Sequence, residues 1–361
     1  MIVNSIRLDQ FRNYESLELE FHQGTNLFYG DNAQGKTNIL ESVYLCGTTR
    51  SHKGSKDREM IRFEQEESHI RMLLEKSSME YRIDMHLKKN KSKGIAVNGV
   101  PVKKAGELIG IGNFIFFSPE DLNIIKNGPA ERRRFLDMEL CQLDSVYLYH
   151  LTNYNKILVQ RNKLLKDIFF HPEYEEMLDV WDEQMVQYGK VLIRLREKFI
   201  RELNGIIYGI HKNLSGGREE LVLSYEKNVE PEVFSKMLRE SREKDLKTKM
   251  SNCGPHRDDM CFVVQGVDIR RYGSQGQQRT AALSLKLSEI EIVKRNINDT
   301  PVLLLDDVLS ELDSSRQRYL LENIHDVQTF ITCTGIDHFV ENHFKIDRLF
   351  RVTAGTVAVE E

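Results

Sequence analysis

The sequence predicts an α/β fold in which both ends of the chain build one lobe and an inserted, mainly helical segment builds a second. Strand-like alternation of β-branched and polar residues fills the first part of the chain and returns after Gly254. Between these parts, from Ala130 to about Glu243, apolar residues recur at helical spacing. A phosphate-loop pattern at residues 30–37 lies between a predicted strand and a predicted helix, which is its usual context.

The composition limits the class of protein. The chain has 361 residues, 5 cysteines and a formal net charge of −4, and its length suits two unequal lobes that each bury a core. No apolar run approaches the roughly 18 residues of a membrane helix, and the first residues resemble a strand rather than a secretory signal. The cysteines lack C-x-x-C or metal-ligand spacing, so we expect reduced thiols and a cytoplasmic protein without membrane contact. The net charge excludes a nucleic-acid binder that is basic over its whole surface, so any contact with nucleic acid must come from a local basic patch.

The apolar patterns divide the chain into two predicted domains: an α/β lobe of residues 1–119 plus 250–361 and a helical insertion of residues 120–249. Val97-Asn98-Gly99-Val100 is typical of a hairpin turn. Trp181, Met185 and Leu192 belong to a stripe on one face of a long helix, which we interpret as packed core. The predicted strands span Ile2–Leu8, Leu17–Phe21, Ile70–Leu74, Tyr81–Leu87, Phe114–Ser118, Met260–Val264, Val302–Leu305, Phe330–Thr332, Leu349–Val352 and Thr356–Val359.

The phosphate-loop pattern predicts a nucleotide site. Its glycines allow the backbone to curl so that successive N–H groups point at phosphates. Lys36 adds a positive charge at the β- and γ-phosphates, and the hydroxyl of Thr37 is a ligand that Mg²⁺ accepts. We therefore predict that the chain binds ATP and Mg²⁺. The residues assigned to this loop are Gly30, Asp31, Asn32, Ala33, Gln34, Gly35, Lys36 and Thr37.

An apolar run that ends in two carboxylates, Val302–Asp307, predicts the second half of the same site. Asp306 is expected to hold Mg²⁺ opposite Thr37. Asp307, one residue beyond the apolar run, is placed to orient or deprotonate an attacking water, with Lys36 as the other catalytic group. Because Asp is shorter than the Glu often found there, we expect weak hydrolysis. The alternative is that Asp307 only caps the next turn.

A third motif, Ser274-Gln-Gly-Gln-Gln-Arg279, precedes a predicted helix over Thr280–Arg295 and resembles the signature of ABC-type ATPases, with Gln275 in place of a glycine. Ser274 is suited to cap that helix, and together with Gly276 and Gln277 it would present hydroxyl and amide groups to a γ-phosphate. In ABC-type heads that phosphate belongs to the other subunit. The resemblance thus implies a head-to-tail homodimer that encloses two ATP molecules, with Ser310–Asp313 along its seam.

Taken together, the motifs resemble the RecF family of bacterial recombinational repair proteins, among the ABC- and SMC-type ATPase heads. The resemblance covers essentially the whole chain. It implies an ATP-dependent homodimer that binds double-stranded DNA and its junctions with single-stranded gaps, recruits RecO and RecR, and helps to load recombinase. It also implies a weak, DNA-stimulated ATPase that acts as a switch. The matching segments are Phe11–Tyr14, Gly30–Glu41, Phe117–Leu122, Gly128–Asp137, Gly254–Asp259, Ser274–Arg279 and Leu305–Asp313.

Some positions are less specific. No glutamine stands within Phe117–Asp121, where other ABC-type heads place a metal-sensing glutamine, and Thr334 is only a provisional γ-phosphate sensor. Two basic clusters suit contacts to DNA phosphates as well as they suit a solvated surface. We interpret Gly254–Asp259 as a structural turn followed by a strand. The basic clusters comprise Arg50, His52, Lys53, Lys56 and Arg58, and Arg132, Arg133 and Arg134.

Three other classes of protein fit the motifs less well. A P-loop kinase would leave Ser274–Arg279 and Ser310–Asp313 without a role. The ATPase subunit of a transporter would carry a shorter insertion, a glutamine loop and a switch histidine. An SMC-like tether needs a far longer arm, because the insertion, folded back on itself at about 1.5 Å per residue, reaches well under 100 Å. A DNA-binding ATPase therefore fits the motifs best.

Overall fold

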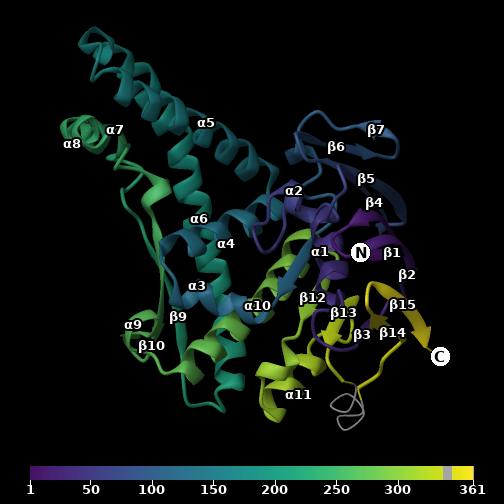
Figure 1. The fold of residues 1–361 in the computed structure, drawn as a ribbon. Helices are drawn as coiled ribbons and strands as arrows, with labels where there is room; N and C mark the ends of the chain where they lie inside the picture. Colours follow the sequence, from purple (N-terminus) through teal and green to yellow (C-terminus); the bar gives the residue numbers. More distant parts are fainter. Residues whose placement is uncertain (336–343, 361) are drawn as a thin grey trace. The chain divides into compact units, whose positions relative to one another are not determined.

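The computed structural model describes residues 1–335 and 344–360, and the chain forms two compact units. Unit 1 combines Met1–Asp121 with Glu289–Glu361, and unit 2 comprises Leu122–Ser288. The chain thus re-enters unit 1 at Glu289, inside helix α10 (Gln275–Ile297), whereas the sequence predicts the boundary at residue 250. The difference arises because strands β9 (Leu221–Glu226) and β10 (Asp259–Val264) pair with each other inside unit 2 (Figure 1).

A six-stranded, largely parallel sheet forms the part of unit 1 that carries the phosphate loop, in the order β15-β14-β3-β13-β12-β8. Strands β14, β3, β13, β12 and β8 run parallel to one another, and β15 is antiparallel to β14. Every residue of β12 and β13 is buried, as expected for strands covered on both faces. The strands are β3 (Thr25–Tyr29), β8 (Phe114–Phe117), β12 (Val302–Asp306), β13 (Thr329–Cys333), β14 (Arg348–Thr353) and β15 (Thr356–Glu360).

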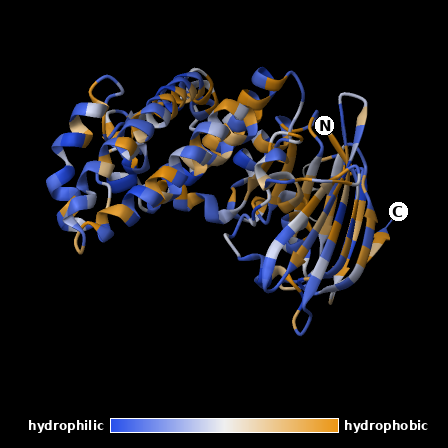
Figure 2. Ribbon diagram, turned by 90° about the horizontal axis from the view of Figure 1, so that it is seen from above, coloured by the Kyte–Doolittle hydropathy of each residue, from blue (hydrophilic) through white to orange (hydrophobic). Residues whose placement is uncertain are grey.

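An antiparallel sheet completes unit 1, in the order β2-β1-β4-β5-β6-β7. Its strands alternate buried apolar and exposed polar residues, and Figure 2 shows this as alternating orange and blue along the strands. The predicted hairpin turn is confirmed, since Asn98 and Gly99 both have positive φ, at 53° and 82°. The strands are β1 (Ile2–Phe11), β2 (Tyr14–Glu20), β4 (Glu67–Lys76), β5 (Met79–Lys88), β6 (Lys91–Val97) and β7 (Val100–Pro101).

Helix α1 (Lys36–Thr48) lies in the core that the two sheets of unit 1 share. Its residues Ile39, Leu40 and Val43 are fully buried and belong to one apolar cluster with side chains from both sheets. This burial fixes the start of α1 directly behind the phosphate loop. The other helical segments of unit 1 are α2 (Asp57–Met60), α11 (Ser314–Glu322), η1 (Ala105–Glu107), η2 (Pro119–Asp121) and η5 (Leu309–Glu311).

Unit 2 is mainly helical, with a three-stranded sheet in the order β11-β10-β9 that the sequence did not predict in full. The helical pattern predicted from Ala130 to about Glu243 includes residues 221–226, which form β9 instead. The predicted core stripe is confirmed at Met185, Leu192 and Phe199 of α6. None of the helices in the described residues is both long and apolar enough to span a membrane. The remaining elements are α3 (Leu122–Lys126), α4 (Pro129–Leu143), α5 (Ser145–Asp167), η3 (Pro172–Met177), α6 (Leu178–Leu214), α7 (Phe234–Glu240), α8 (Arg242–Thr248), η4 (Pro255–Arg257), β11 (Val267–Asp268) and α9 (Ile269–Tyr272).

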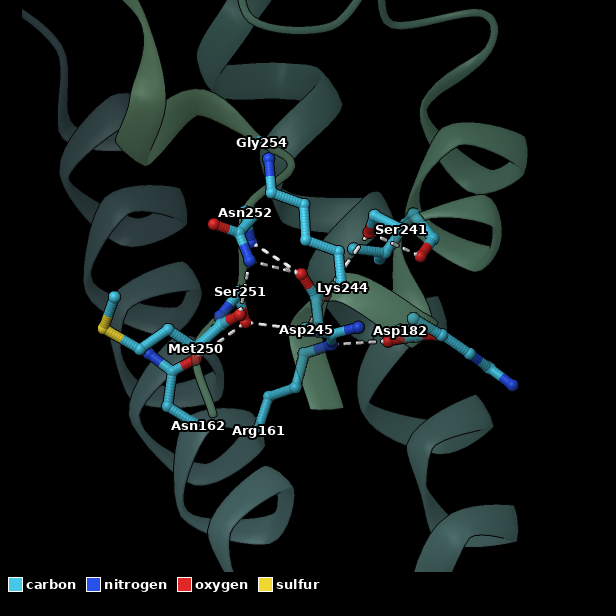
Figure 3. A network of polar contacts seen from close by, with 12 residues as sticks. Arg161, Asn162, Asp182, Ser241, Lys244, Asp245, Met250, Ser251, Asn252 and Gly254 are labelled. Atoms are coloured by element: carbon cyan, nitrogen blue, oxygen red, sulfur yellow. Dashed lines mark hydrogen bonds and ion pairs between the residues drawn. The ribbon is translucent and has the colours of Figure 1, made fainter. Parts of the chain in front are cut away.

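A buried ionic network ties helices α5, α6 and α8 together (Figure 3). Arg161, which is fully buried, donates to Asp182 at 2.6 Å and to Asp245 at 2.7 Å. It also donates to the hydroxyl of Ser251 at 2.8 Å. Since an unpaired buried charge is costly, this network fixes the relative positions of the three helices.

The segment Gly254–Asp259 follows this network and is confirmed as a structural turn, η4, that leads into β10. Nδ1 of His256 lies 2.7 Å from the hydroxyl of Tyr154, and Asp258 is paired with Arg196 at 3.2 Å. Asp259 accepts from Arg132 at 2.6 Å. These side chains are therefore engaged in holding unit 2 together.

Candidate nucleotide site

The phosphate loop of unit 1 needs glycine at both ends of its pattern. Gly30 has φ 146° and Gly35 has φ 115°, a region that side chains disfavour. A Cβ on Gly30 would lie 2.3 Å from the carbonyl oxygen of Val352, and a Cβ on Gly35 would lie 2.4 Å from Asn13 Nδ2. The loop is thus enclosed by backbone and side chains of neighbouring segments.

The middle of the loop is exposed where a ligand would reach it. Asp31, Asn32 and Ala33 are exposed, and Ala33 has φ 61°, which turns the backbone back on itself. Gln34 holds the loop from outside, because its side-chain oxygen accepts from the backbone N–H of Ala354 at 2.5 Å. This combination leaves backbone N–H groups at the surface of a tight turn, the arrangement that binds anions.

The turn between β1 and β2 supports the loop, a role that the sequence did not reveal. Asn13 Nδ2 donates to the carbonyl of Gln34 at 2.9 Å, and the hydroxyl of Tyr14 donates to the carbonyl of Gly35 at 3.1 Å. Arg12 binds Glu41 of α1 with two hydrogen bonds, of 2.7 and 2.8 Å. Phe11–Tyr14 had been used only as a family landmark. Nothing in its residue types indicated a contact with residues so far along the chain.

Lys36 folds back onto the loop that it follows. Its Nζ donates to the carbonyl oxygens of Gly30 at 2.5 Å and of Asp31 at 2.8 Å. Burial lowers the pKa of Lys36, and the neighbouring Cys333, Asp307 and Asp306 oppose that shift. The amine therefore lies beside both the loop and the acidic end of β12.

The two predicted halves of the site meet at Asp306. The hydroxyl of Thr37 donates to Asp306 Oδ1 at 2.7 Å across 269 positions of sequence. A second hydroxyl, of Thr332 on β13, donates to the same oxygen at 2.7 Å. Carboxylate and hydroxyl oxygens are the donors that Mg²⁺ prefers, so this set fits the predicted ion. The sequence carries no signal for Thr332, and Thr334, its provisional sensor, is an exposed residue beyond the end of β13.

Asp307 has a backbone conformation that sets it apart from the strand before it. Its φ is 53°, and its backbone N–H donates to the Thr332 hydroxyl at 3.0 Å. Burial raises the pKa of Asp307; Ser310 and Lys36 oppose this shift, while Asp306 and Glu311 add to it. The next turn is held by Ser310, whose hydroxyl donates to the backbone carbonyl of Asp307 at 2.8 Å.

With this geometry in place, comparison with known proteins is informative. A family model described as RecF/RecN/SMC N terminal domain matches residues 2–358. A DNA replication and repair protein RecF from Agathobacter rectalis is 63% identical over 359 residues, 99% of each chain. The chain belongs to the RecF family.

Solved structures agree with this family and with its fold. A structure of the recombination mediator protein RecF with ATP, in the RecFOR pathway, is 38% identical with a TM-score of 0.93 and covers 100% of this chain and 98% of that chain. The head domain of Smc from Pyrococcus furiosus is 15% identical with a TM-score of 0.58, covers 99% of this chain and 96% of that one, and therefore shows the fold alone. The predicted ABC-type P-loop head with an inserted second lobe is thus confirmed.

The signature segment of this RecF-family chain lies in unit 2, at the start of α10. The hydroxyl of Ser274 accepts from the backbone N–H of Gln277 at 3.2 Å, and Gln277 Oε1 accepts from the backbone N–H of Ser274 at 2.9 Å. This reciprocal pair is a capping box, so the predicted cap is confirmed. A Cβ on Gly276 would have only the Ser274 hydroxyl near it, at 3.9 Å, which leaves the backbone open to a ligand.

Glu219, in the segment between α6 and β9, holds the capping side chain in place and was not predicted. Gln277 Nε2 donates to Glu219 Oε1 at 3.0 Å. The other oxygen of Glu219 lies 3.5 Å from Nε2 of His211, a fully buried residue near the end of α6. His211 in turn contacts Ser284 of α10 at 2.9 Å. The carboxylate thus connects the first turn of α10 with its middle.

The two basic clusters differ in what their side chains can do. Arg132 is buried against Asp259, and Arg133 donates to the backbone carbonyl of Asp258 at 2.7 Å, so this cluster is mainly structural. In the other cluster, His52 stacks on the ring of Phe116 with centroids 3.8 Å apart. The exposed members of that cluster are Arg50, Lys53, Lys56 and Arg58.

Proposed function

We propose that this chain is an ATP-dependent DNA-binding protein of replication and recombinational repair, in which ATP drives formation of a homodimer. The observation that carries the proposal is the 2.7 Å hydrogen bond between Thr37 and Asp306, which joins the phosphate loop and the acidic strand end in one site. RecF-family membership and a similar RecF structure with ATP support the same nucleotide.

ATP would be held by the phosphate loop and Lys36. The positive-φ glycines and the exposed residues 31–33 suit a loop that turns its backbone N–H groups to the β- and γ-phosphates. Lys36 lies close enough to exchange its carbonyl contacts for phosphate oxygens. Mg²⁺ would be held by Thr37 and Asp306. When bound, it would neutralise charge on the phosphates.

Asp307 is the residue we propose to orient the attacking water. It follows the Mg²⁺ carboxylate directly, its backbone is fixed by Thr332, and its raised pKa makes its carboxylate a better proton acceptor than an ordinary aspartate. The short side chain favours slow hydrolysis, which would reset the dimer rather than form a product.

The signature segment would act on a second copy of the chain. Ser274, Gly276 and Gln277 form the first turn of the long helix α10, whose N-terminus attracts an anionic group. Since Glu219 fixes the Gln277 side chain, the turn is preorganised for the γ-phosphate held by the partner.

DNA would be bound through its backbone rather than by reading of bases. Arg50, Lys53, Lys56 and Arg58 supply exposed positive charge in a chain whose net charge is −4. Double-stranded DNA and its junctions with single strands are the proposed ligands, and RecO and RecR the proposed partners. Similarity to a RecF of the RecFOR pathway supports these partners.

The proposal is tested by measuring mass and DNA retention of the purified chain without nucleotide, with ATP and Mg²⁺, and with a non-hydrolysable ATP analogue. Wild type should form a dimer that retains gapped duplex DNA only with nucleotide. Ser274→Arg should bind ATP as a monomer and lose both dimer and DNA. Val159→Arg, at an exposed residue of α5, is the matched control and should behave as wild type.

A monomer that is indifferent to DNA yet turns over ATP with a small-molecule acceptor would overturn the proposal. That result would favour a P-loop kinase. Nucleotide-driven dimerisation without any DNA retention would instead favour a transporter-type ATPase subunit.

A further inference from the structure

Two histidines and a glutamate gather on the polar face of the antiparallel sheet, away from the phosphate loop. Glu67 and His69 are two residues apart on β4, so both point to the same face, while Ser68 between them is fully buried. His86 on β5 stands directly opposite His69 in the strand register. The next strand places Gly94 opposite His86, which leaves the space beside the imidazole free of a side chain.

The three side chains are close enough to share one ion. His86 Nε2 lies 2.9 Å from Glu67 Oε2, and His69 Nε2 lies 3.9 Å from Glu67 Oε1. One ligand atom from each residue lies within 4.8 Å of the other two. Metal–ligand bonds are about 2.0–2.2 Å in length, so the three side chains must move closer together to reach one ion. The two imidazole rings, stacked with centroids 3.9 Å apart, must also turn so that the plane of each ring points at the ion. His69 and Glu67 are exposed and His86 is partly exposed, which leaves them room to do so.

The donor set selects the kind of ion. Two imidazole nitrogens and one carboxylate oxygen suit Zn²⁺ and related transition metals, whereas Mg²⁺ prefers oxygen donors alone. One competing cation is the ammonium of Lys88, 4.0 Å from Glu67 on a side chain that is 38% exposed and can therefore move away.

The position also has room for a further ligand. A groove of about 560 Å³ lies over the sheet beside the two histidines, and its polar wall includes Arg7, Asp9 and Arg71. Three protein ligands beside an open groove form the arrangement of a zinc site that keeps one position for water or an anion.

We propose that Glu67, His69 and His86 form a binding site for a zinc-class divalent metal ion. The ion would link β4 to β5 and bind independently of the nucleotide site. Because binding to the folded state alone stabilises it, the ion should also raise the midpoint of thermal unfolding.

The experiment is a calorimetric titration of the full-length chain with Zn²⁺ in excess Mg²⁺, which blocks the oxygen ligands at Asp306. A parallel titration with Co²⁺ follows the visible absorption of a tetrahedral complex with nitrogen ligands. Wild type should bind one equivalent of Zn²⁺. Even groups that only orient a ligand affect metal affinity about 10–100-fold, so His69→Ala and His86→Ala should each weaken binding by at least about tenfold.

Glu67→Gln keeps the size of the side chain and should also weaken binding. His325→Ala removes an exposed histidine outside the cluster and should leave the titration unchanged. Unfolding of each variant in EDTA shows whether the sheet is intact. If wild type and a folded His69→Ala/His86→Ala double variant bind Zn²⁺ equally, or if the wild-type Co²⁺ spectrum shows only weak octahedral absorption, the proposed site is wrong.

Discussion

The hydroxyl of Thr332 donates a 2.7 Å hydrogen bond to Asp306 Oδ1, the same oxygen that accepts from Thr37. The Thr332 hydroxyl also accepts from the backbone N–H of Asp307. One buried side chain on β13 therefore orients the residue proposed to hold Mg²⁺ and fixes the backbone of the residue proposed to act on water.

Replacing Thr332 with Val should reduce ATP turnover while leaving the fold in place. Valine is nearly the same size, so the strand still packs, but Asp306 loses a hydrogen bond and the N–H of Asp307 loses its acceptor. We expect a loss of about 1–3 kcal/mol in the free energy of unfolding. Mg²⁺-dependent turnover should fall about 10–100-fold, as measured by phosphate release over a Mg²⁺ titration.

Thr329→Val is the matched control for Thr332→Val. Thr329 is equally buried on the same strand, but its hydroxyl donates to the backbone carbonyl of Val327 rather than to the site. This variant should lose stability and keep its turnover. Equal turnover in the two variants would show that Thr332 does not act through Asp306.

Arg12→Ala should destabilise unit 1 in a manner that depends on pH. Glu41 is 1% exposed; burial raises its pKa, but the hydrogen bonds from Arg12 and Ser51 outweigh this, and the pKa is lowered. A lowered carboxylate pKa contributes stability above the unfolded value of about 4.3, and the contribution is lost as pH falls through the folded value. Without Arg12, Glu41 is a buried charge lacking its partner.

The expected loss for Arg12→Ala is about 2–3 kcal/mol at pH 7, shrinking as the pH falls below about 4. Urea unfolding followed by circular dichroism at several pH values measures it. Arg62→Ala breaks an exposed pair with Glu15 and should change stability by less than about 1 kcal/mol at every pH. A loss for Arg12→Ala that is the same at pH 3 and pH 7 would show that Glu41 is not its source.

Arg161→Met should destabilise unit 2 strongly. Asp182 and Asp245 are both buried, and Asp245 would lose its only described ion pair. Removing one partner of a buried ion pair costs about 3–5 kcal/mol. Trp181 is the only tryptophan in the sequence and packs beside Leu164 and Leu178 in this unit, so its fluorescence during urea unfolding reports the change locally.

Arg194→Met is the control in the same region, because Arg194 is 62% exposed and its described ion pair is with exposed Glu232. Its effect should stay within about 0.5 kcal/mol. If Arg161→Met were as stable as Arg194→Met, the network would be replaceable by apolar packing, as some buried ion pairs are.

The sequence predicted those parts of the site whose chemistry lies in contiguous residues. The glycines at 30 and 35, the acidic end of β12 and the Ser274 cap follow from local rules of backbone conformation and helix capping. The alternation of apolar and polar residues along each strand is also a local pattern, and it therefore predicted the sheets.

What the sequence did not predict depends on contacts between distant residues. Thr332 acquires a role only because β13 lies beside β12, and Arg132 loses its proposed DNA role only because Asp259 lies next to it. The sequence does not predict strand β9, because its partner β10 lies far along the chain. No local pattern carries such information.

Glu219→Ala should weaken the ATP-dependent dimer without affecting ATP binding by the monomer, because Glu219 belongs to unit 2 and the phosphate loop to unit 1. Without Glu219 the Gln277 side chain is free to rotate. Its hydrogen bond to the N–H of Ser274 is then weaker. A charged hydrogen bond of this kind is worth about 1.5–3 kcal/mol, so the dimer dissociation constant should rise at least about tenfold in sedimentation experiments.

Glu219→Gln retains a carbonyl that accepts from Gln277 and should restore most of the dimer. Glu220→Ala is the neighbouring control, because Glu220 pairs with Tyr208 at the exposed surface. If Glu219 acts by positioning Gln277, Glu219→Gln should restore the dimer and Glu220→Ala should leave the dimer unchanged. If Glu219→Ala dimerises like wild type while Ser274→Arg stays monomeric, the signature turn is held by its own capping box, and Glu219 contributes only to the packing of α10.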